Sequence, residues 1–106
     1  MVELERIEKI LADRTHGSSW IALNSLIASH KLAREGVDPL FLLKLIAKRR
    51  REMSALRNLS LVGIELLRRG LKGDEVFARL ILEFRKSEEE FAKSAVVSSS
   101  RIDRFI

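Results

Sequence analysis

The chain has 106 residues, of which 46% are hydrophobic and 33% are charged, and its formal net charge is +5 at pH 7. This composition indicates one globular domain with a buried core and excludes a disordered tail, which would be poor in Leu and Ile. The sequence has no cysteine, which excludes disulfides, thiolate nucleophiles and metal sites built from cysteine.

Apolar residues recur at helical spacing along the whole chain and no strand-like alternation persists, which predicts an all-α protein. The first predicted helix spans residues 2–13 and ends before Gly17, where we expect left-handed backbone geometry. Ser18 or Ser19 is expected to cap the second helix, which stops at Gly36. A short turn would therefore join these two helices.

Asp38 and Pro39 predict the start of a third helix, with the aspartate as its N-cap and the proline at its first position. A bend at Met53 leads into a fourth helix over residues 55–69, which stops at Gly70. The side chains predicted to point inward from the second to fourth helices include Trp20, Leu23, Ile27, Leu40, Leu43, Ile46, Ala47, Leu56, Leu59, Val62, Leu66 and Leu67.

Asp74 is expected to cap the fifth and longest helix. With five helices, short turns and no linker, the sequence predicts a compact helical bundle that forms a single domain over residues 1–106. The apolar stripe of the last helix is predicted to comprise Phe77, Leu80, Ile81, Phe84, Phe91, Ala95 and Ile102.

The sequence does not indicate an enzyme. A serine nucleophile needs a base that a third group orients, and the two histidines, His16 and His30, accompany no strand-borne nucleophile turn. Asp13 and His16 would give zinc two ligands where three or four are usual. The three carboxylates at residues 88–90 share one helix surface and cannot face each other across a pocket. We therefore predict no catalytic residues, no bound metal and no cofactor.

A basic run at residues 48–51 is the first feature that points to a binding function. On a helix its side chains spread around most of a turn, so several would form a cluster in solvent. Such a cluster suits a nucleic-acid backbone or an acidic partner, although no aromatic residues for single-strand recognition interleave with it. The alternative interpretation is a solvated face. We define the basic cluster as Lys44, Lys48, Arg49, Arg50, Arg51 and Arg57.

The turn before the second helix is the other candidate site. Free N–H groups at a helix N-terminus attract anions, and a glycine lets a ligand approach the backbone closely. An ordinary turn between two helices is the alternative interpretation. The candidate anion-binding residues are Arg14, His16, Gly17, Ser18 and Ser19.

This turn also carries a family resemblance. Residues 16–23, HGSSWIAL, resemble the Arg-Gly-Ala/Ser loop and the following helix in the N-terminal domain of translation initiation factor 2B alpha/beta/delta-type proteins and the related ribose-1,5-bisphosphate and methylthioribose-1-phosphate isomerases. Residues 51–58, REMSALRN, resemble the family's bend into a helix bearing Asn. The long closing helix through residues 100–102 is similar to the helix that precedes the family's Rossmann-like domain. His16 replaces the family's arginine, and the proline of the bend is missing.

The resemblance implies a non-catalytic regulatory or protein-interaction domain, because the isomerases carry their catalytic cysteine and aspartate in the Rossmann-like domain. It implies a protein partner, either of the initiation factor 2 type or a second copy of the chain. Given the apolar end at residues 105–106, we expect a stand-alone remnant or the N-terminal part of a longer protein. The alternative function is a helical nucleic-acid-binding module that uses the basic cluster.

Two further expectations concern the protein's origin. No apolar run is long enough to span a membrane and the first residues do not resemble a signal peptide, so we expect a cytoplasmic protein. The sequence has no glutamine and only the asparagines Asn24 and Asn58, beside abundant Glu, Lys, Arg and Ile. This scarcity of thermolabile amides indicates a thermophilic source.

Overall fold

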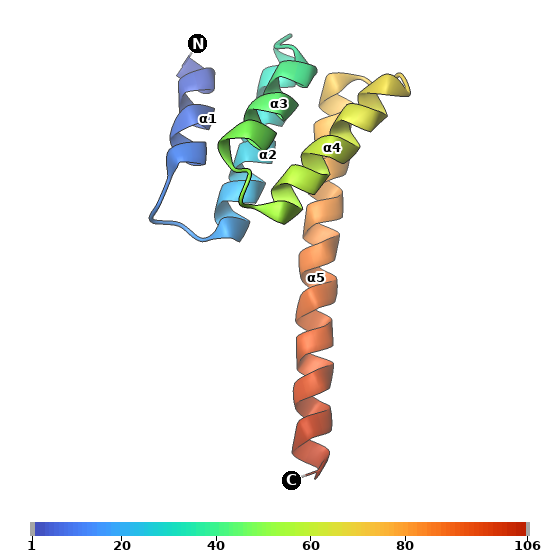
Figure 1. The fold of residues 1–106 in the computed structure, drawn as a ribbon. Coiled ribbons are helices and arrows are strands. Elements are labelled where there is room, and N and C mark those ends of the chain that lie inside the picture. Colours follow the sequence, from blue (N-terminus) through green and yellow to red (C-terminus); the bar gives the residue numbers. More distant parts are fainter. Residues whose placement is uncertain (1, 106) are drawn as a thin grey trace.

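The computed structural model describes the backbone of residues 2–105 and the side chains of residues 4–90. Over these residues it has five helices and no strand, which confirms the predicted all-α bundle with a long last helix. None of the described helices is both long enough and apolar enough to cross a membrane. The helices are α1 (Val2–Ala12), α2 (Ser18–Arg34), α3 (Pro39–Arg49), α4 (Ser54–Arg68) and α5 (Gly73–Phe105) (Figure 1).

The helices form two layers. In one layer α2 lies between α1 and α5 and packs most extensively against α5, while α3 and α4 pair to form the other layer. Figure 1 shows α3 in front of α2 and α4 in front of α5, with the C-terminal part of α5 extending past the other helices. The contacts between α4 and α5 and between α2 and α3 join the layers. Three helices therefore meet where the first turns of α2 and α4 approach the middle of α5.

One apolar stripe from each helix forms the core. Phe77 of α5 is the largest fully buried side chain, and burying an aromatic or aliphatic side chain of this kind contributes about 1.5–3 kcal/mol. The buried apolar residues are Ile7, Ile10, Leu11, Ile21, Ala22, Leu26, Ala28, Leu32, Leu42, Leu43, Ile46, Leu56, Val76, Phe77, Leu80 and Phe84.

Small residues let α4 approach its neighbours closely. A Cβ atom added to Gly63 would lie 2.8 Å from Leu43 Cδ2 on α3 and 3.0 Å from Leu80 Cδ1 on α5. The buried hydroxyls of Ser25 and Ser60 donate hydrogen bonds to carbonyls of their own helices at 3.0 Å, so they add no unpaired polar group to the core. Gly63 therefore helps to set how closely the two layers approach.

Several helix ends follow the predicted chemistry. Asp38 is the N-cap of α3, where its Oδ1 accepts a hydrogen bond from the backbone N–H of Leu40 at 3.0 Å, and Pro39 occupies the first helical position. Gly36 and Gly70 have φ angles of 98° and 97° and end α2 and α4, as expected. Glycine adopts this left-handed conformation without the Cβ clash of other residues.

The predicted caps at three other positions are wrong. Gly17 has φ −73° and ψ 168°, which is extended backbone, and it serves as the N-cap of α2 without a side-chain hydrogen bond. Ser18 and Ser19 are consequently the first residues of the helix and do not cap it. The helix α5 begins at Gly73, two residues earlier than a cap at Asp74 predicts, so Asp74 lies in its first turn. Its carboxylate can still interact favourably with the positive end of the helix dipole.

The predicted inward faces are correct at their centres and wrong at their edges. The α3 side chains Leu43 and Ile46 are buried as predicted, and Leu42 joins them because α3 packs against α4 on one side and α1 and α2 on the other. A two-layer bundle covers a narrower arc of each helix than the apolar residues occupy. Phe91, Ala95 and Ile102 lie outside the described side chains. The residues predicted inward that are instead exposed are Trp20, Ile27, Leu40 and Val62.

Candidate functional site

The turn before α2 is closed by a carboxylate of the chain itself. Asp13 Oδ1 accepts hydrogen bonds from the backbone N–H groups of Thr15 at 2.7 Å and His16 at 2.9 Å, and its Oδ2 lies 2.8 Å from His16 Nδ1. The hydrogen bonds from His16 and Thr15 hold the pKa of the Asp13 carboxyl well below its usual range. The His16 ring stacks on Trp20, with ring centroids 3.7 Å apart. The backbone N–H groups of Thr15 and His16 are therefore already hydrogen-bonded to a carboxylate of the chain itself.

The structure divides the candidate anion-binding residues. His16 faces Asp13 and Trp20, whereas Ser18 and Ser19 line a pocket on the other side of the helix start. Gly17 and Arg14 are exposed, and neither lines this pocket. Of the five candidate residues, the two serines are the ones that line it.

The basic cluster is also divided, because α3 ends at Arg49 and its run does not continue along one helix. Arg50 is only 8% exposed, and its Nε lies 3.3 Å from both Met53 Sδ and Glu52 Oε1. An Arg49 side-chain nitrogen lies 2.9 Å from Glu8 Oε2, which ties α3 to α1. The cluster members that are exposed without an ion pair to a described residue are Lys44, Lys48, Arg51 and Arg57.

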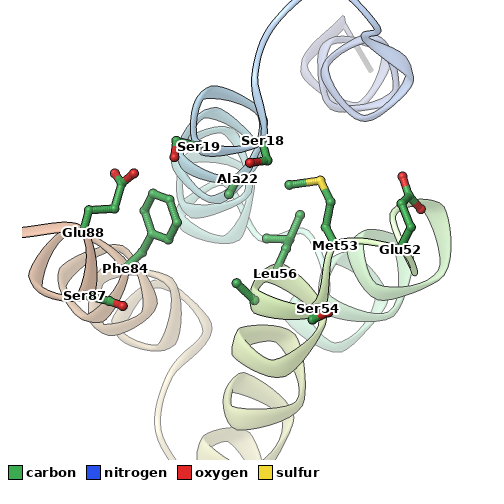
Figure 2. A pocket seen from close by; sticks show the side chains of 11 residues that line it. Ser18, Ser19, Ala22, Glu52, Met53, Ser54, Leu56, Phe84, Ser87 and Glu88 are labelled. Carbon is green, nitrogen blue, oxygen red and sulfur yellow. The ribbon is translucent and has the colours of Figure 1, made fainter. Parts of the chain in front are cut away.

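A pocket of about 630 Å³ lies where the first turns of α2 and α4 meet the middle of α5. Figure 2 shows Phe84 from α5, Leu56 from α4 and Met53 from the turn before α4 extending toward Ala22 of α2. Glu88 stands beside Phe84 at the edge of the pocket (Figure 2). The pocket therefore combines an apolar floor with polar edges.

The pocket continues as a groove between α4 and α5. Two further hollows of about 270 and 400 Å³ follow it: the nearer shares Phe84 and Ser87 with the pocket, and the two share Val62 and Glu83 with each other. We call the two hollows together the α4–α5 groove. Its lining residues are Ala55, Asn58, Leu59, Val62, Leu66, Arg69, Leu71, Arg79, Leu80, Glu83, Phe84 and Ser87.

The groove has an apolar floor and charged side chains at its edges. Arg69 and Arg79 line the end near the α4–α5 turn, and Glu83 lines both hollows. Glu88 lines only the neighbouring pocket. Val62 is 49% exposed on the groove wall. A concave apolar surface with charged edges is suited to binding a protein segment.

We did not predict this groove from the sequence, although the sequence contains one indication of it. The predicted apolar face of α4 includes Leu59, Val62 and Leu66 beside the deeply placed Leu56, which makes it wider than contact with one neighbouring helix requires. Apolar residues in excess of what the core can cover indicate a surface for another partner. That α5 forms the opposite wall followed only from the fold.

Among the described residues, no three His, Cys, Asp or Glu side chains gather closely enough to hold a metal ion. Comparisons with protein-family models, with curated proteins and with solved structures yield no match to this chain. The similarity to initiation factor 2B-type proteins therefore depends on the three sequence segments quoted above.

Proposed function

We propose that the chain is a non-catalytic protein-interaction domain that acts in the cytoplasm and binds its partner through the α4–α5 groove. The observation that carries this proposal is the groove itself, an apolar channel between two helices that is open to solvent. The partner would insert an amphipathic helix, whose apolar side chains would cover Leu59, Val62 and Leu66. Removing such apolar surface from water contributes about 25 cal/mol per Å².

The resemblance to initiation factor 2B-type proteins supports one class of partner. In that case the chain would bind a subunit of initiation factor 2 and would act as a regulatory domain. The second class of partner is another copy of the chain itself. Both classes use the same groove, and the same pair of variants tests them.

Val62 and Leu61 provide the matched pair. Both are exposed on α4, Val62 at 49% and Leu61 at 54%, but only Val62 lines the groove. A carboxylate in place of Val62 would be buried without a partner when the groove is occupied, which costs several kcal/mol. The same change at Leu61 adds an equal charge outside the groove. The difference between Val62→Glu and Leu61→Glu therefore isolates the groove.

The test is native mass spectrometry of the purified chain, alone and with purified initiation factor 2 subunits from the same organism. We expect a complex, either with itself or with a subunit, that Val62→Glu abolishes and Leu61→Glu preserves. A strict monomer without affinity for any subunit would contradict the proposal. Equal loss with both variants would also contradict it, because the groove would then not be the binding surface.

A second function is favoured by the four exposed members of the basic cluster. Lys44 and Lys48 lie one turn apart on α3, Arg51 follows in the turn after α3, and Arg57 lies in the first turn of α4. None of the four has an ion pair to a described residue. If these cations contact about four phosphates, the logarithm of the affinity for duplex DNA would fall with the logarithm of salt concentration at a slope of about −3.6. Filter binding at low salt tests this function, and retention that Lys44→Glu/Lys48→Glu does not weaken would exclude it.

A further inference from the structure

We propose that the partner segment in the α4–α5 groove is an amphipathic helix with a carboxylate at the position that faces Arg69 and Arg79. This inference rests on the proposed function, since it names the chemistry of the segment that the same groove binds. Arg69 at the end of α4 and Arg79 of α5 line the same hollow, so cations from two walls border one concave surface. Opposite charges across an interface fix the register of a partner and disfavour wrong partners.

Both arginines are available to a partner. Arg79 is exposed and has no ion pair to a described residue. The Arg69 Nε atom lies 3.7 Å from Glu65 Oε1, and the two side chains are 71% and 52% exposed. Exposed ion pairs of this kind contribute at most about 1 kcal/mol. A carboxylate on the bound segment can therefore take the place of Glu65 beside Arg69 at little cost.

The apolar side chains of the same hollow favour a protein segment over a nucleic acid. A phosphate backbone would pair with the arginines but would leave the apolar floor in contact with water. An amphipathic helix covers that floor with its apolar face and presents charged side chains at the edges of the same face. The apolar residues that line this hollow are Leu59, Val62, Leu66, Leu71 and Leu80.

Glu83 limits where the acidic side chain of the partner can lie. Of the described residues that line the hollow of about 270 Å³, only Glu83 is charged. It lies four residues beyond Arg79 on α5, which is about 6 Å along the helix axis. The groove is therefore basic near the α4–α5 turn and acidic beyond it. A partner carboxylate is favoured at the first of these positions and repelled at the second, which gives the bound helix one register.

The test is selection from a phage-displayed library of amphipathic helices that share a leucine face and carry Glu, Gln or Lys at each flanking position. We expect the native chain to enrich helices with Glu at one end of that face. The double variant Arg69→Glu/Arg79→Glu should enrich Lys at the same position, a reversal that an unfolded variant could not produce. In calorimetric titration with the enriched peptide, each single variant should lower the affinity about fivefold or more.

Arg68 and Arg85 provide matched controls. Arg68 adjoins Arg69, is 76% exposed and lies 3.8 Å from the same glutamate, but it does not line the groove. Arg85 is exposed on α5 and lines neither hollow. Arg68→Glu and Arg85→Glu change the net charge by the same amount as the groove variants, yet they should leave the affinity for the enriched peptide nearly unchanged.

Three results would overturn the inference. The first is that no helix is enriched, including the case in which duplex DNA binds through Arg69 and Arg79 instead. The second is enrichment without a preference for Glu, or a preference that the double variant does not reverse. The third is an equal loss of affinity with Arg68→Glu, because the attraction would then be to the net charge of the chain.

The failure of this inference is distinguishable from the failure of the proposed function. If the enriched helices bind in a manner that depends on Val62 but show no preference for Glu, the inference fails and the proposed function stands. The same holds if no helix is enriched but native mass spectrometry shows a complex that Val62→Glu abolishes. If no helix is enriched and no such complex forms, both fail.

Discussion

The carboxylate of Asp13 ends α1 and sets the course of the chain into α2. It accepts hydrogen bonds from the backbone N–H groups of Thr15 and His16, which would otherwise be unpaired beyond the last helical residue. Gly17 can consequently remain in extended backbone and does not need the left-handed geometry that its position after a helix suggests. A short-range side-chain hydrogen bond of this kind competes with the usual glycine termination.

This network predicts a dependence of stability on pH. The folded-state pKa of Asp13 is depressed below its ordinary value of 3.8, so the unfolded state binds the proton first as pH falls. The stabilisation is present above pH 4 and declines as pH falls from about 4 toward the folded-state pKa. We expect the free energy of unfolding to fall less between pH 7 and pH 3 in Asp13→Asn than in the native chain. Urea denaturation at both pH values measures this difference, and identical losses would contradict the assignment.

Arg50 and Arg51 are adjacent in the basic run but have different environments. Arg50 is buried against Met53, whereas Arg51 is exposed in the turn after α3. Arg50→Ala should lower the free energy of unfolding by about 1–2 kcal/mol, because packing and a charged hydrogen bond are lost. Arg51→Ala should change it by less than about 0.5 kcal/mol. Urea denaturation of the two variants provides the comparison, and equal effects would show that Arg50 is not part of the core.

At the helix ends, Gly36 and Gly70 are required for their backbone conformation, whereas Gly17 is not, and substitution separates the two cases. Gly36 and Gly70 have positive φ angles, so Gly36→Ala and Gly70→Ala should each destabilise the fold by about 1–2 kcal/mol. Gly17 has a φ angle that any residue adopts, and no atom lies within 4 Å of an added Cβ. Gly17→Ser should stabilise the fold by up to about 1 kcal/mol, since it supplies a cap and restricts the unfolded chain. Thermal melting gives the sign of each change, and a stabilising Gly70→Ala would contradict this account.

The helices themselves were predictable because local chemistry determines where they begin and end. The Asp38 cap, the proline after it and the stops at Gly36 and Gly70 are features of adjacent residues. Which apolar side chains are covered depends on packing between distant segments, and this is why Val62 was wrongly predicted to point inward. The basic run was misread for a related reason, since the end of α3 at Arg49 turns Arg50 back against the bundle.

At the scale of the whole molecule, two layers of helices leave a seam that no described element covers. The α4–α5 groove lies along this seam, and its walls come from α4 and α5, whose pairing no sequence pattern indicated. Ser18 and Ser19, which were predicted as anion-binding candidates, line the pocket at one end of this seam, but the groove beyond them was not anticipated. A site of this kind arises from the arrangement of helices and has no sequence motif of its own.

The central claim is that this groove binds protein, and photo-cross-linking from within it is the most direct measurement. The photoreactive residue p-benzoylphenylalanine would replace Val62 in one variant and Leu61 in another, and both chains would be irradiated alone and with initiation factor 2 subunits. We predict a covalent product from position 62 and little product from position 61. Equal yields from the two positions, or no product from position 62 with any of these proteins, would contradict the claim.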